Sequence, residues 1–275
     1  MQRQSRDVDG ELLAWHEQGE GVPVVLVHGI PTGPELWRHV APLVADARCL
    51  AFEMLGYAGS IPLGEGRDIS VAAQAARLLR WLDALGIDRA VLVGHDLGGG
   101  VVQIAAVTDP RRCAGLVLSN AIAYDSWPIP SVKAMRAAGA IVERMPAPLF
   151  RPTFSAFIAL GHDDRRGGAE SRDVHWGPYE QHGAAPAFVR QIRSLRTEDT
   201  LAIADRLPTL HVPARVVWGA ADRFQKLRYG ERLARDLRAQ LTRVEGGRHF
   251  VPEDHPGAIA AAINDVVAEV RHRRG

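Results

Sequence analysis

Apolar residues gather into short, nearly continuous runs along this chain, separated by longer stretches in which they recur at helical spacing. The first run covers residues 22–27, and further runs cover 49–52, 90–93, 116–118 and 215–218. Runs of this length without polar alternation are typical of strands that helices cover on both faces. They therefore predict the strands of a mostly parallel sheet.

Helical spacing is clearest in residues 70–85, which begin with Ser70, a residue type that caps helix N-termini. The last stretch, about 257–271, is apolar on one face and predicts a helix that closes the domain. Residues 5–18 alternate polar and apolar on both sides of Asp9-Gly10, which predicts an antiparallel hairpin at one edge. Strands that alternate with helices place the chain in the α/β class, with helices on both sides of the sheet.

The alternation of strand and helix stops between about residues 125 and 206 and resumes at Ala214. The interrupted segment is rich in proline, carries a polar run over 161–173 and contains three apparent short helices. We therefore expect a core domain formed by residues 1–124 and 207–275, with a mainly helical insertion over 125–206.

Composition narrows the class of protein without pointing to a function. The chain has 275 residues, of which 47% are hydrophobic and 24% charged, as in ordinary globular proteins. Its 33 Lys and Arg residues against 32 Asp and Glu residues give no electrostatic reason to expect a nucleic acid or a membrane surface as partner. Cys49 and Cys113 lack metal-ligand spacing, and no leader peptide or membrane span is evident, so a cytoplasmic protein is expected.

The most specific motif is Gly94-His95-Asp96-Leu97-Gly98, between a predicted strand and an apolar, helix-like run. It matches the nucleophile elbow, in which glycines allow a tight strand-to-helix turn that raises one side chain at the helix N-terminus. Asp96 would be that nucleophile. The structural alternative is an aspartate that only caps the helix.

A second loop, His28-Gly29-Ile30-Pro31, ends the first buried strand. In folds with this elbow, such a loop supplies one backbone N–H to an oxyanion hole, and the residue after the nucleophile supplies the other. Ile30 and Leu97 would then be the two donors. A turn that merely reverses the chain is the alternative.

Two more residues complete a catalytic order. Asp222 follows the strand at 215–218, and His249 follows a glycine-rich turn after the strand-like residues 240–244. Nucleophile, acid and base in the chain order Asp96, Asp222, His249 is the order of this architecture. Asp222 as a helix cap and His249 as a surface or core residue remain alternatives.

Over nearly its whole length the chain resembles enzymes of the α/β-hydrolase fold. The resemblance rests on His28-Gly29-Ile30-Pro31-Thr32, Gly94-His95-Asp96-Leu97-Gly98-Gly99 and His249-Phe250-Val251-Pro252-Glu253. The chain is most similar to the branch with an Asp nucleophile, which contains epoxide hydrolases, haloalkane dehalogenases and fluoroacetate dehalogenase. This resemblance implies that residues 125–206 form a helical cap over the active site.

An aspartate nucleophile indicates attack on a saturated carbon and an alkyl ester of Asp96, instead of the acyl-enzyme that a serine would form. His249, held by Asp222, would then activate water to hydrolyse the ester. This chemistry requires no metal or organic cofactor. The expected partners are a small hydrophobic substrate and water, and the expected state is a monomer or homodimer.

The first chemical step distinguishes the substrates. Halide-binding side chains that the resemblance would place beside the nucleophile and in the early loop are replaced by Leu97 and Ile30, and an arginine that would grip a carboxylate is also absent at Leu97. Opening an epoxide needs a proton donor, which in related epoxide hydrolases is a pair of cap tyrosines. No tyrosine stands at the positions where those enzymes usually carry the pair. Tyr179 and Tyr124 are therefore the candidate donors, although either could be a buried structural aromatic.

The sequence therefore favours an epoxide hydrolase that forms vicinal diols. The candidate pocket residues all have aromatic side chains: His28, Trp37, Trp127 and Trp176. A haloalkane dehalogenase that binds halide through Trp127 or Trp176 is the alternative enzyme. A non-catalytic ligand receptor on the same fold is the alternative of another class.

Overall fold

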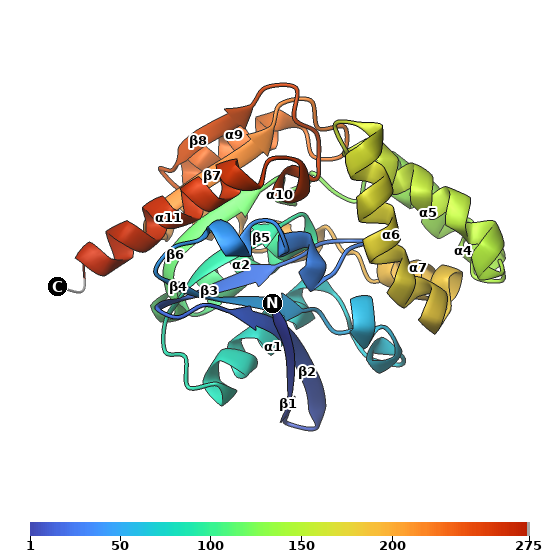
Figure 1. Cartoon of the computed structure of the whole chain (residues 1–275), viewed down its shortest axis with the longest axis horizontal. Coiled ribbons are helices and arrows are strands. Elements are labelled where there is room, and N and C mark those ends of the chain that lie inside the picture. Colours follow the sequence, from blue (N-terminus) through green and yellow to red (C-terminus); the bar gives the residue numbers. More distant parts are fainter. Residues whose placement is uncertain (274–275) are drawn as a thin grey trace.

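Eight strands form a single sheet in the computed structural model, which describes residues 1–273 (Figure 1). The spatial order is β1-β2-β4-β3-β5-β6-β7-β8, with β1 and β2 antiparallel and every pairing from β4 to β8 parallel. The strands are β1 (Gln2–Val8), β2 (Glu11–Gln18), β3 (Val22–Val27), β4 (Ala47–Glu53), β5 (Ala90–His95), β6 (Cys113–Ser119), β7 (Ala214–Gly219) and β8 (Gln240–Val244). The predicted strands, the N-terminal hairpin and the α/β class are confirmed.

Helices flank this sheet, and their ends follow the local sequence. Ser70 accepts a hydrogen bond from the amide of Ala73, so it caps the predicted helix as expected. Helix α2 packs against β3, β5 and β6, and α11 packs against β5, β6 and β7. The core helices are α1 (Val71–Ala84), α2 (Leu97–Thr108), α9 (Leu227–Asp236), α10 (Val251–Asp254) and α11 (Pro256–His272). Short 3₁₀ helices are η1 (Pro34–Trp37), η2 (Ala41–Leu43), η3 (Ala58–Ser60), η4 (Pro62–Gly64), η5 (Pro110–Arg112) and η6 (Ala204–Thr209).

The segment between β6 and β7 is helical, as expected, but it contains six α-helices where the sequence predicted three. Several prolines mark helix starts instead of breaks, because proline fits the first turn, where its missing N–H is not needed. Asp164 caps α6, so most of the polar run at 161–173 is helical. These helices project to one side of the sheet in Figure 1. They are α3 (Pro130–Ala137), α4 (Gly139–Val142), α5 (Ala147–Gly161), α6 (Arg165–His182), α7 (Ala184–Arg193) and α8 (Glu198–Leu201).

The glycines of the elbow are required by a close approach between α2 and the sheet. A Cβ atom on Gly98 would lie 2.1 Å from the carbonyl oxygen of Val27, and one on Gly94 would lie 2.4 Å from the carbonyl oxygen of Gly98. Both distances are far inside van der Waals contact, so a side chain would push α2 off β3. The tight contact fixes the start of α2, and with it the residue at the top of the turn.

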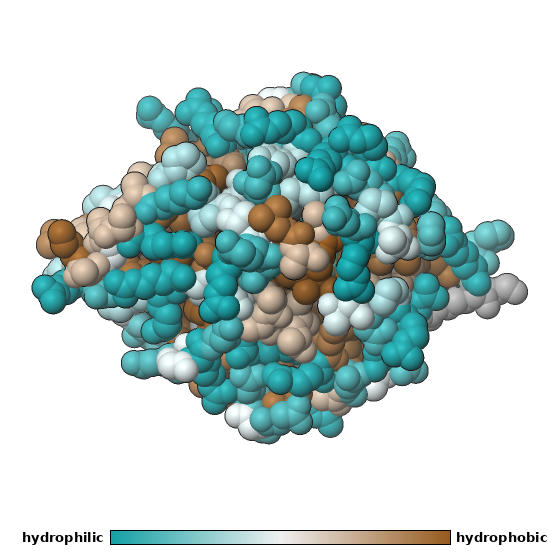
Figure 2. Space-filling view, turned by 180° about the vertical axis from the view of Figure 1, so that it is seen from behind, coloured by the Kyte–Doolittle hydropathy of each residue, from teal (hydrophilic) through white to brown (hydrophobic). Residues whose placement is uncertain are grey.

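The face opposite to that of Figure 1 is mostly hydrophilic, with a small hydrophobic group near its middle and another at the tip of the helical segment (Figure 2). The most exposed large apolar side chain, Ile141 at 76%, belongs to α4 in that segment. In residues 1–273 no helix has both the length and the apolar character to cross a bilayer.

Candidate active site

Asp96 occupies the turn between β5 and α2 in a conformation that few residues adopt, with φ 50° and ψ −119°. Strain of this kind is typical of the nucleophile elbow. The side chain makes no capping hydrogen bond to α2, although Asp96 stands at the N-cap position. Its Oδ2 instead accepts a hydrogen bond from the amide of Ile30 at 3.0 Å. Helix capping therefore does not explain this aspartate.

The environment of Asp96 is that of a reactive carboxylate. Burial raises its pKa, and the charge of His249 and the backbone amides of Ile30 and Leu97 lower it, with a net shift upward. A poorly hydrated carboxylate that few donors stabilise is a better nucleophile than one in water. The expected donor Ile30 makes a hydrogen bond of good geometry, whereas the Leu97 amide influences the same carboxylate without one.

His249 faces Asp96 from the other side of the site. Its Nδ1 lies 2.9 Å from Oδ2 of Asp222, and its Nε2 lies 4.0 Å from Oδ1 of Asp96. With the proton on Nδ1, the Nε2 lone pair points toward the nucleophile. Burial lowers the pKa of His249, but the carboxylates of Asp222 and Asp96 raise it, and the net shift is upward. The structure thus brings together the three residues that the sequence placed in one order.

Asp222 is held as an anion at the end of β7. Burial raises its pKa, but His249, Asn120 and the amide of Phe224 together lower it by more than burial raises it, so the net shift is downward. The Phe224 amide donates to Oδ1 at 2.7 Å, and Asn120 Nδ2 donates to Oδ2 at 2.6 Å. A carboxylate with this many donors orients an imidazole and does not take its proton.

Asn120 is a site residue that the sequence analysis missed. It follows β6 with φ 44°, is fully buried, and its Oδ1 accepts from the amide of Gly219 at 3.2 Å. It therefore ties the ends of β6 and β7 together beneath Asp222. An asparagine directly after a buried strand is the only local sign of this role, because asparagine tolerates positive φ.

Asn120→Ala is expected to lower kcat about 10-fold with little change in KM, because Asp222 loses a donor and His249 loses its fixed orientation. The free energy of unfolding should fall by about 1–3 kcal/mol, since the Gly219 amide and the Asp222 carboxylate are left short of partners. Steady-state kinetics and urea denaturation measure both. The control Asn264→Ala removes hydrogen bonds to the backbone of residues 43 and 45 far from the site and should leave kcat unchanged. An unchanged kcat in Asn120→Ala would contradict the prediction.

The loop that carries His249 is clamped to the end of α5 in the helical segment. The amides of His249 and Phe250 both donate to the carbonyl oxygen of Gly161, at 2.9 and 3.0 Å. His95, next to the nucleophile, lies 2.9 Å through Nε2 from the carbonyl oxygen of His249, and burial lowers its pKa to about 3, so it is a neutral donor. Both contacts fix the backbone of the histidine and not its reactive edge.

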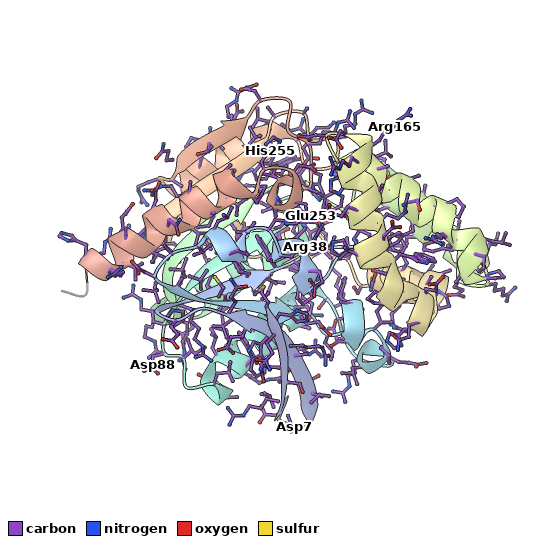
Figure 3. The ribbon with its side chains drawn as sticks, viewed as in Figure 1. Asp7, Arg38, Asp88, Arg165, Glu253 and His255 are labelled. Carbon is purple, nitrogen blue, oxygen red and sulfur yellow. The ribbon has the colours of Figure 1, made fainter. Side chains whose placement is uncertain are left out.

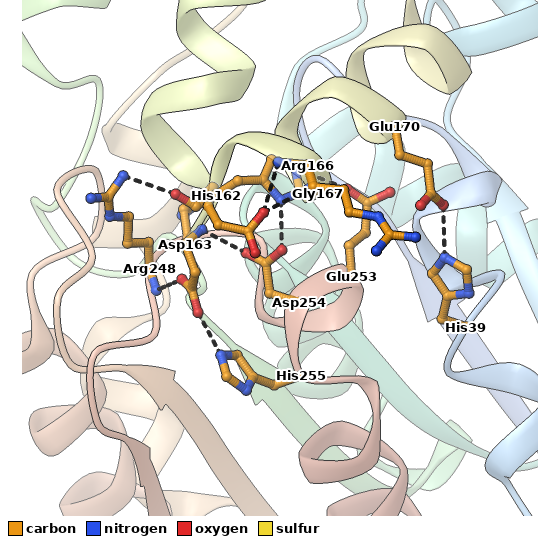
Figure 4. A network of polar contacts seen from close by, with 12 residues as sticks. His39, His162, Asp163, Arg166, Gly167, Glu170, Arg248, Glu253, Asp254 and His255 are labelled. Carbon is orange, nitrogen blue, oxygen red and sulfur yellow. Dashed lines mark hydrogen bonds and ion pairs between the residues drawn. The ribbon is translucent and has the colours of Figure 1, made fainter.

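Charged residues extend this clamp along the junction between the core and the helical segment, where Figure 3 shows Arg38, Glu253 and His255. Figure 4 shows the network in detail. His162 Nδ1 lies 2.8 Å from Asp254 Oδ1, and its Nε2 lies 3.3 Å from Glu253 Oε2 without hydrogen-bond geometry. Asp163 Oδ1 accepts from the amide of Arg248 at 2.7 Å. The helical segment thus positions the residue next to His249.

Stability is expected to fall as the pH rises from about 6.5 to 9, because His162 is charged in this network. Burial lowers its pKa, but Asp254 and Glu253 raise it, to about 9. A histidine whose pKa is raised by folding stabilises the protein fully below the unfolded pKa of about 6.5 and loses that contribution through the folded value. The contribution is on the order of 3 kcal/mol. Urea denaturation across this pH range measures it, and His162→Gln should flatten the curve; an equal slope in both proteins would refute the assignment.

A partly open, mainly apolar cavity of about 40 Å³ is lined by Asp96 and His249. Water-sized molecules need about 10–15 Å³ each by this measure, so the cavity holds roughly three of them. The residues that line it are Ile30, Asp96, Leu97, Ile122, Trp127, Pro128, Ile129, Val132, Phe157, Leu195, Phe224, Gln225 and His249. The site is therefore shaped for a small substrate with an apolar body.

Neither of the two predicted proton donors reaches this cavity. The hydroxyl of Tyr124 donates to Asp236 of α9 at 2.6 Å, and Arg232 lies 3.7 Å above its ring. Tyr124 has φ 53°, which turns its side chain away from the strand end where the sequence placed it. The hydroxyl of Tyr179 donates to Gln191 at 2.6 Å inside the helical segment. The expectation that Tyr124 faces the site is wrong, and Tyr179 is held as a buried structural aromatic.

Of the four predicted pocket residues, the structure places only Trp127 in the cavity wall. Its Nε1 already donates to Thr200 Oγ1 at 2.7 Å. His28 is fully buried and bonds through its two ring nitrogens to the backbone of residues 29 and 54, and burial lowers its pKa to about 3. Trp37 is fully buried in the core, and Trp176 packs edge-on against Phe154. Aromatic type alone did not distinguish a pocket wall from packing.

No group of three or more His, Cys, Asp or Glu side chains in residues 1–273 is arranged to hold a metal ion.

The sequence matches a family model described as the alpha/beta hydrolase fold over residues 22–256. It is 31% identical to haloalkane dehalogenase 2 of Mycobacterium tuberculosis (strain ATCC 25618 / H37Rv), over 90% of this chain and 88% of that protein. It is 24% identical to epoxide hydrolase 4 of Mus musculus, over 91% and 74%. Among solved structures, an alpha/beta hydrolase fold protein from Burkholderia ambifaria superposes with a TM-score of 0.84 at 29% identity, over 95% of this chain and 97% of that one.

Proposed function

The chain belongs to the α/β-hydrolase fold family, with relatives in its Asp-nucleophile branch, and from that premise we propose that it hydrolyses small apolar substrates at a saturated carbon. The observation that carries the proposal is the buried carboxylate of Asp96 at a strained elbow, with Nε2 of His249 4.0 Å away. A carboxylate in this place forms an alkyl ester with a saturated carbon. The helical segment over residues 125–206 acts in this proposal as the cap of the site.

In the first step, one oxygen of Asp96 attacks the substrate carbon, and the bond from that carbon to the leaving group breaks with its electron pair. The apolar wall of the cavity excludes water, which would otherwise solvate the carboxylate and weaken its attack. The amide of Ile30 holds the other oxygen, so that the carboxylate is aimed during the reaction.

In the second step, His249 removes a proton from water as the water attacks the carbonyl carbon of the ester. The negative charge that develops on the carbonyl oxygen of the ester is stabilised by the backbone amides of Ile30 and Leu97. Each such donor contributes about 3–4 kcal/mol in comparable sites. Asp222 stabilises the imidazolium that forms on His249. The tetrahedral intermediate then collapses: the bond from the carbonyl carbon to the alkoxide oxygen breaks, and the imidazolium of His249 gives its proton to that oxygen. The products are an alcohol and the regenerated Asp96 carboxylate.

Haloalkanes are the first candidate substrates, because the cavity wall provides no acid. Expelling a halide needs no proton, whereas the alkoxide formed from an epoxide does. Apart from Asp96 and His249, the polar side-chain groups of the lining residues are the indole of Trp127 and the amide of Gln225, and neither is an acid near neutral pH. The identity to a haloalkane dehalogenase over 90% of the chain agrees with this choice.

Epoxides remain the second candidate. Leu97 and Ile30 occupy positions where the dehalogenases that the sequence resembles carry halide-binding side chains. An epoxide hydrolase is also among the relatives that span most of the chain. In that case a water molecule in the cavity would have to deliver the proton that Tyr179 and Tyr124 cannot.

The rate of hydrolysis is expected to fall at low pH with a midpoint above 6.5. His249 acts as a base only when Nε2 is unprotonated, and the carboxylate of Asp222, which stays charged while Asp96 is esterified, raises its pKa against the effect of burial. A pH profile of kcat measures the midpoint. Asp222→Asn should move the midpoint downward as well as lower the maximum rate, and a wild-type midpoint below 6.5 would contradict the prediction.

The test of the function is a panel of 1-chloro- and 1-bromoalkanes with two to six carbons, beside terminal and internal epoxides of similar size. Halide release and diol formation are scored separately. We expect halide release from the shortest bromoalkanes, because the cavity is small. Diol without halide would make the protein an epoxide hydrolase, and neither product from any compound would reject hydrolysis at saturated carbon.

A further inference from the structure

The amide of Gln225 is a polar group in the cavity wall that the two chemical steps do not yet use. Gln225 is 3% exposed and lines the cavity together with Asp96 and His249. Its Oε1 is buried without a hydrogen-bond partner. No hydrogen bond from its Nε2 is found within residues 1–273, so this N–H group is free to donate to a ligand in the cavity.

The other buried glutamines differ from Gln225 in the use of Nε2. Gln74 donates through Nε2 to the carbonyl oxygen of Leu55, Gln103 to those of Gly99 and Ile122, and Gln191 to that of Gly56. Gln103 shares the unpartnered Oε1, but its Nε2 is bound to backbone. The side chain of Gln225 makes no such bond, and a structural role for its amide is therefore not supported by contacts.

The backbone of Gln225 is held in place, so the amide is presented and not free to turn away with its loop. Its carbonyl oxygen accepts a hydrogen bond from Nε1 of Trp218 at 2.9 Å, and Trp218 is fully buried. The preceding amide, of Phe224, donates to Asp222. The loop that fixes the acid of the site thus also fixes Gln225, three residues later in the chain.

Gln225 enters the cavity from a different strand than the nucleophile. It follows β7, whereas Asp96 follows β5, and β6 lies between them in the sheet. Strands two positions apart are separated by roughly 10 Å. Both residues line the same cavity, and an in-line displacement sends the leaving group away from the attacking oxygen.

We propose that the Nε2–H group of Gln225 binds the departing halide in the first step. The Asp96 oxygen forms its bond to carbon as the carbon–halogen bond breaks, and the halogen leaves as halide with the electron pair. The amide donates a hydrogen bond to that anion and transfers no proton. The indole of Trp127, which the sequence suggested for this role, is already committed to Thr200. The inference rests on the proposed function and names the donor that it lacks.

Gln225→Met tests the role, because methionine has a similar volume and no donor. The first step is isolated in a His249→Gln background, where the alkyl ester on Asp96 accumulates and intact-mass spectrometry follows it over time. We expect Gln225→Met to slow alkylation by chloroethane about 10- to 100-fold, and alkylation by iodoethane less, since iodide needs less stabilisation. The melting temperature should stay equal or rise, because an unpartnered amide is replaced by an apolar group.

Two further variants keep the conclusion independent of one substitution. Gln225→Leu removes the donor with a shorter apolar side chain and should slow the first step as well. Gln240→Met changes an exposed glutamine on β8 and should alter neither rate nor melting temperature.

The outcomes separate the two proposals. Equal alkylation rates in the Gln225 variants and their parent would overturn the role of Gln225 and leave the proposed function standing. A lowered melting temperature with an equal slowing for every halogen would indicate a structural role instead. No mass increase with any haloalkane in the His249→Gln protein, or an increase with epoxides alone, would reject the haloalkane function and the halide donor together.

Discussion

Asp96→Ala is expected to reduce turnover at least about 10⁴-fold, to the limit of detection, while the protein stays folded. The carboxylate of Asp96 is the nucleophile that bonds to the substrate carbon, and no other carboxylate lines the cavity in residues 1–273. The free energy of unfolding should fall by no more than about 1 kcal/mol. Alanine is mildly strained at φ 50°, but the variant no longer buries a carboxylate whose pKa burial raises.

Halide or diol release and urea denaturation, measured on the same preparation, check this prediction. The matched control is Asp164→Ala, which removes an exposed aspartate that caps α6. The control should lose stability by about 1 kcal/mol and keep full turnover. Residual turnover above one per cent in Asp96→Ala would show that Asp96 is not the nucleophile. Ligand binding by a wild-type protein that turns over no substrate would instead support a receptor on this fold.

His249→Gln is expected to stop the reaction after its first step. Glutamine keeps a hydrogen bond to Asp222 but cannot take a proton from water, so the ester on Asp96 accumulates. Steady-state turnover should fall about 10³- to 10⁴-fold, as in other sites that lose their general base. The mass of the intact protein should rise by one alkyl group per chain during incubation with a substrate.

Peptide mapping would place this added mass on the elbow peptide that contains Asp96. The control His39→Gln changes a histidine whose side chain is 44% exposed and which pairs with Glu170, and it should turn over normally without gaining mass. Lost turnover without a mass increase would mean that His249 acts in the first step. Full turnover in His249→Gln would remove it from the mechanism.

The two predictions differ in what a failure would mean. Asp96 tests whether a covalent nucleophile exists, and His249 tests whether its ester is resolved by base-activated water. The contacts that position His249, from Asn120 through Asp222 and from Gly161 through the backbone, belong to the second step alone. Substitutions that remove these contacts should therefore lengthen the lifetime of the ester and leave its rate of formation unchanged.

The sheet and the three principal site residues followed from local sequence. A buried parallel strand is recognisable because helices on both faces demand an unbroken apolar run, as in Val22–Val27. The elbow is recognisable because only glycine fits where α2 meets β3, as the 2.1 Å approach at Gly98 shows. Asp222 and His249 follow strands of the same sheet, so their order along the chain indicated that they meet.

The direction of other side chains depended on packing that no local pattern encodes. Tyr124 lies five residues after the end of β6, and a positive φ and a hydrogen bond to Asp236 turn its hydroxyl away from the cavity. The hydroxyl of Tyr179 donates a hydrogen bond to Gln191, a residue of the next helix. Trp37 fills the core, and its residue type could not distinguish that role from a pocket wall, because both environments are apolar.

The sequence by itself thus determined where the backbone runs and which residue stands on the elbow, because glycine, proline and apolar periodicity constrain the chain within a few residues. Tertiary structure decided which side chains face the cavity, that Asn120 donates a hydrogen bond to Asp222, and that the side-chain oxygen of Gln225 is left without a partner. Those facts depend on contacts between segments as far apart as residues 120 and 222, and each is set by the space and the donors that distant segments leave to one another.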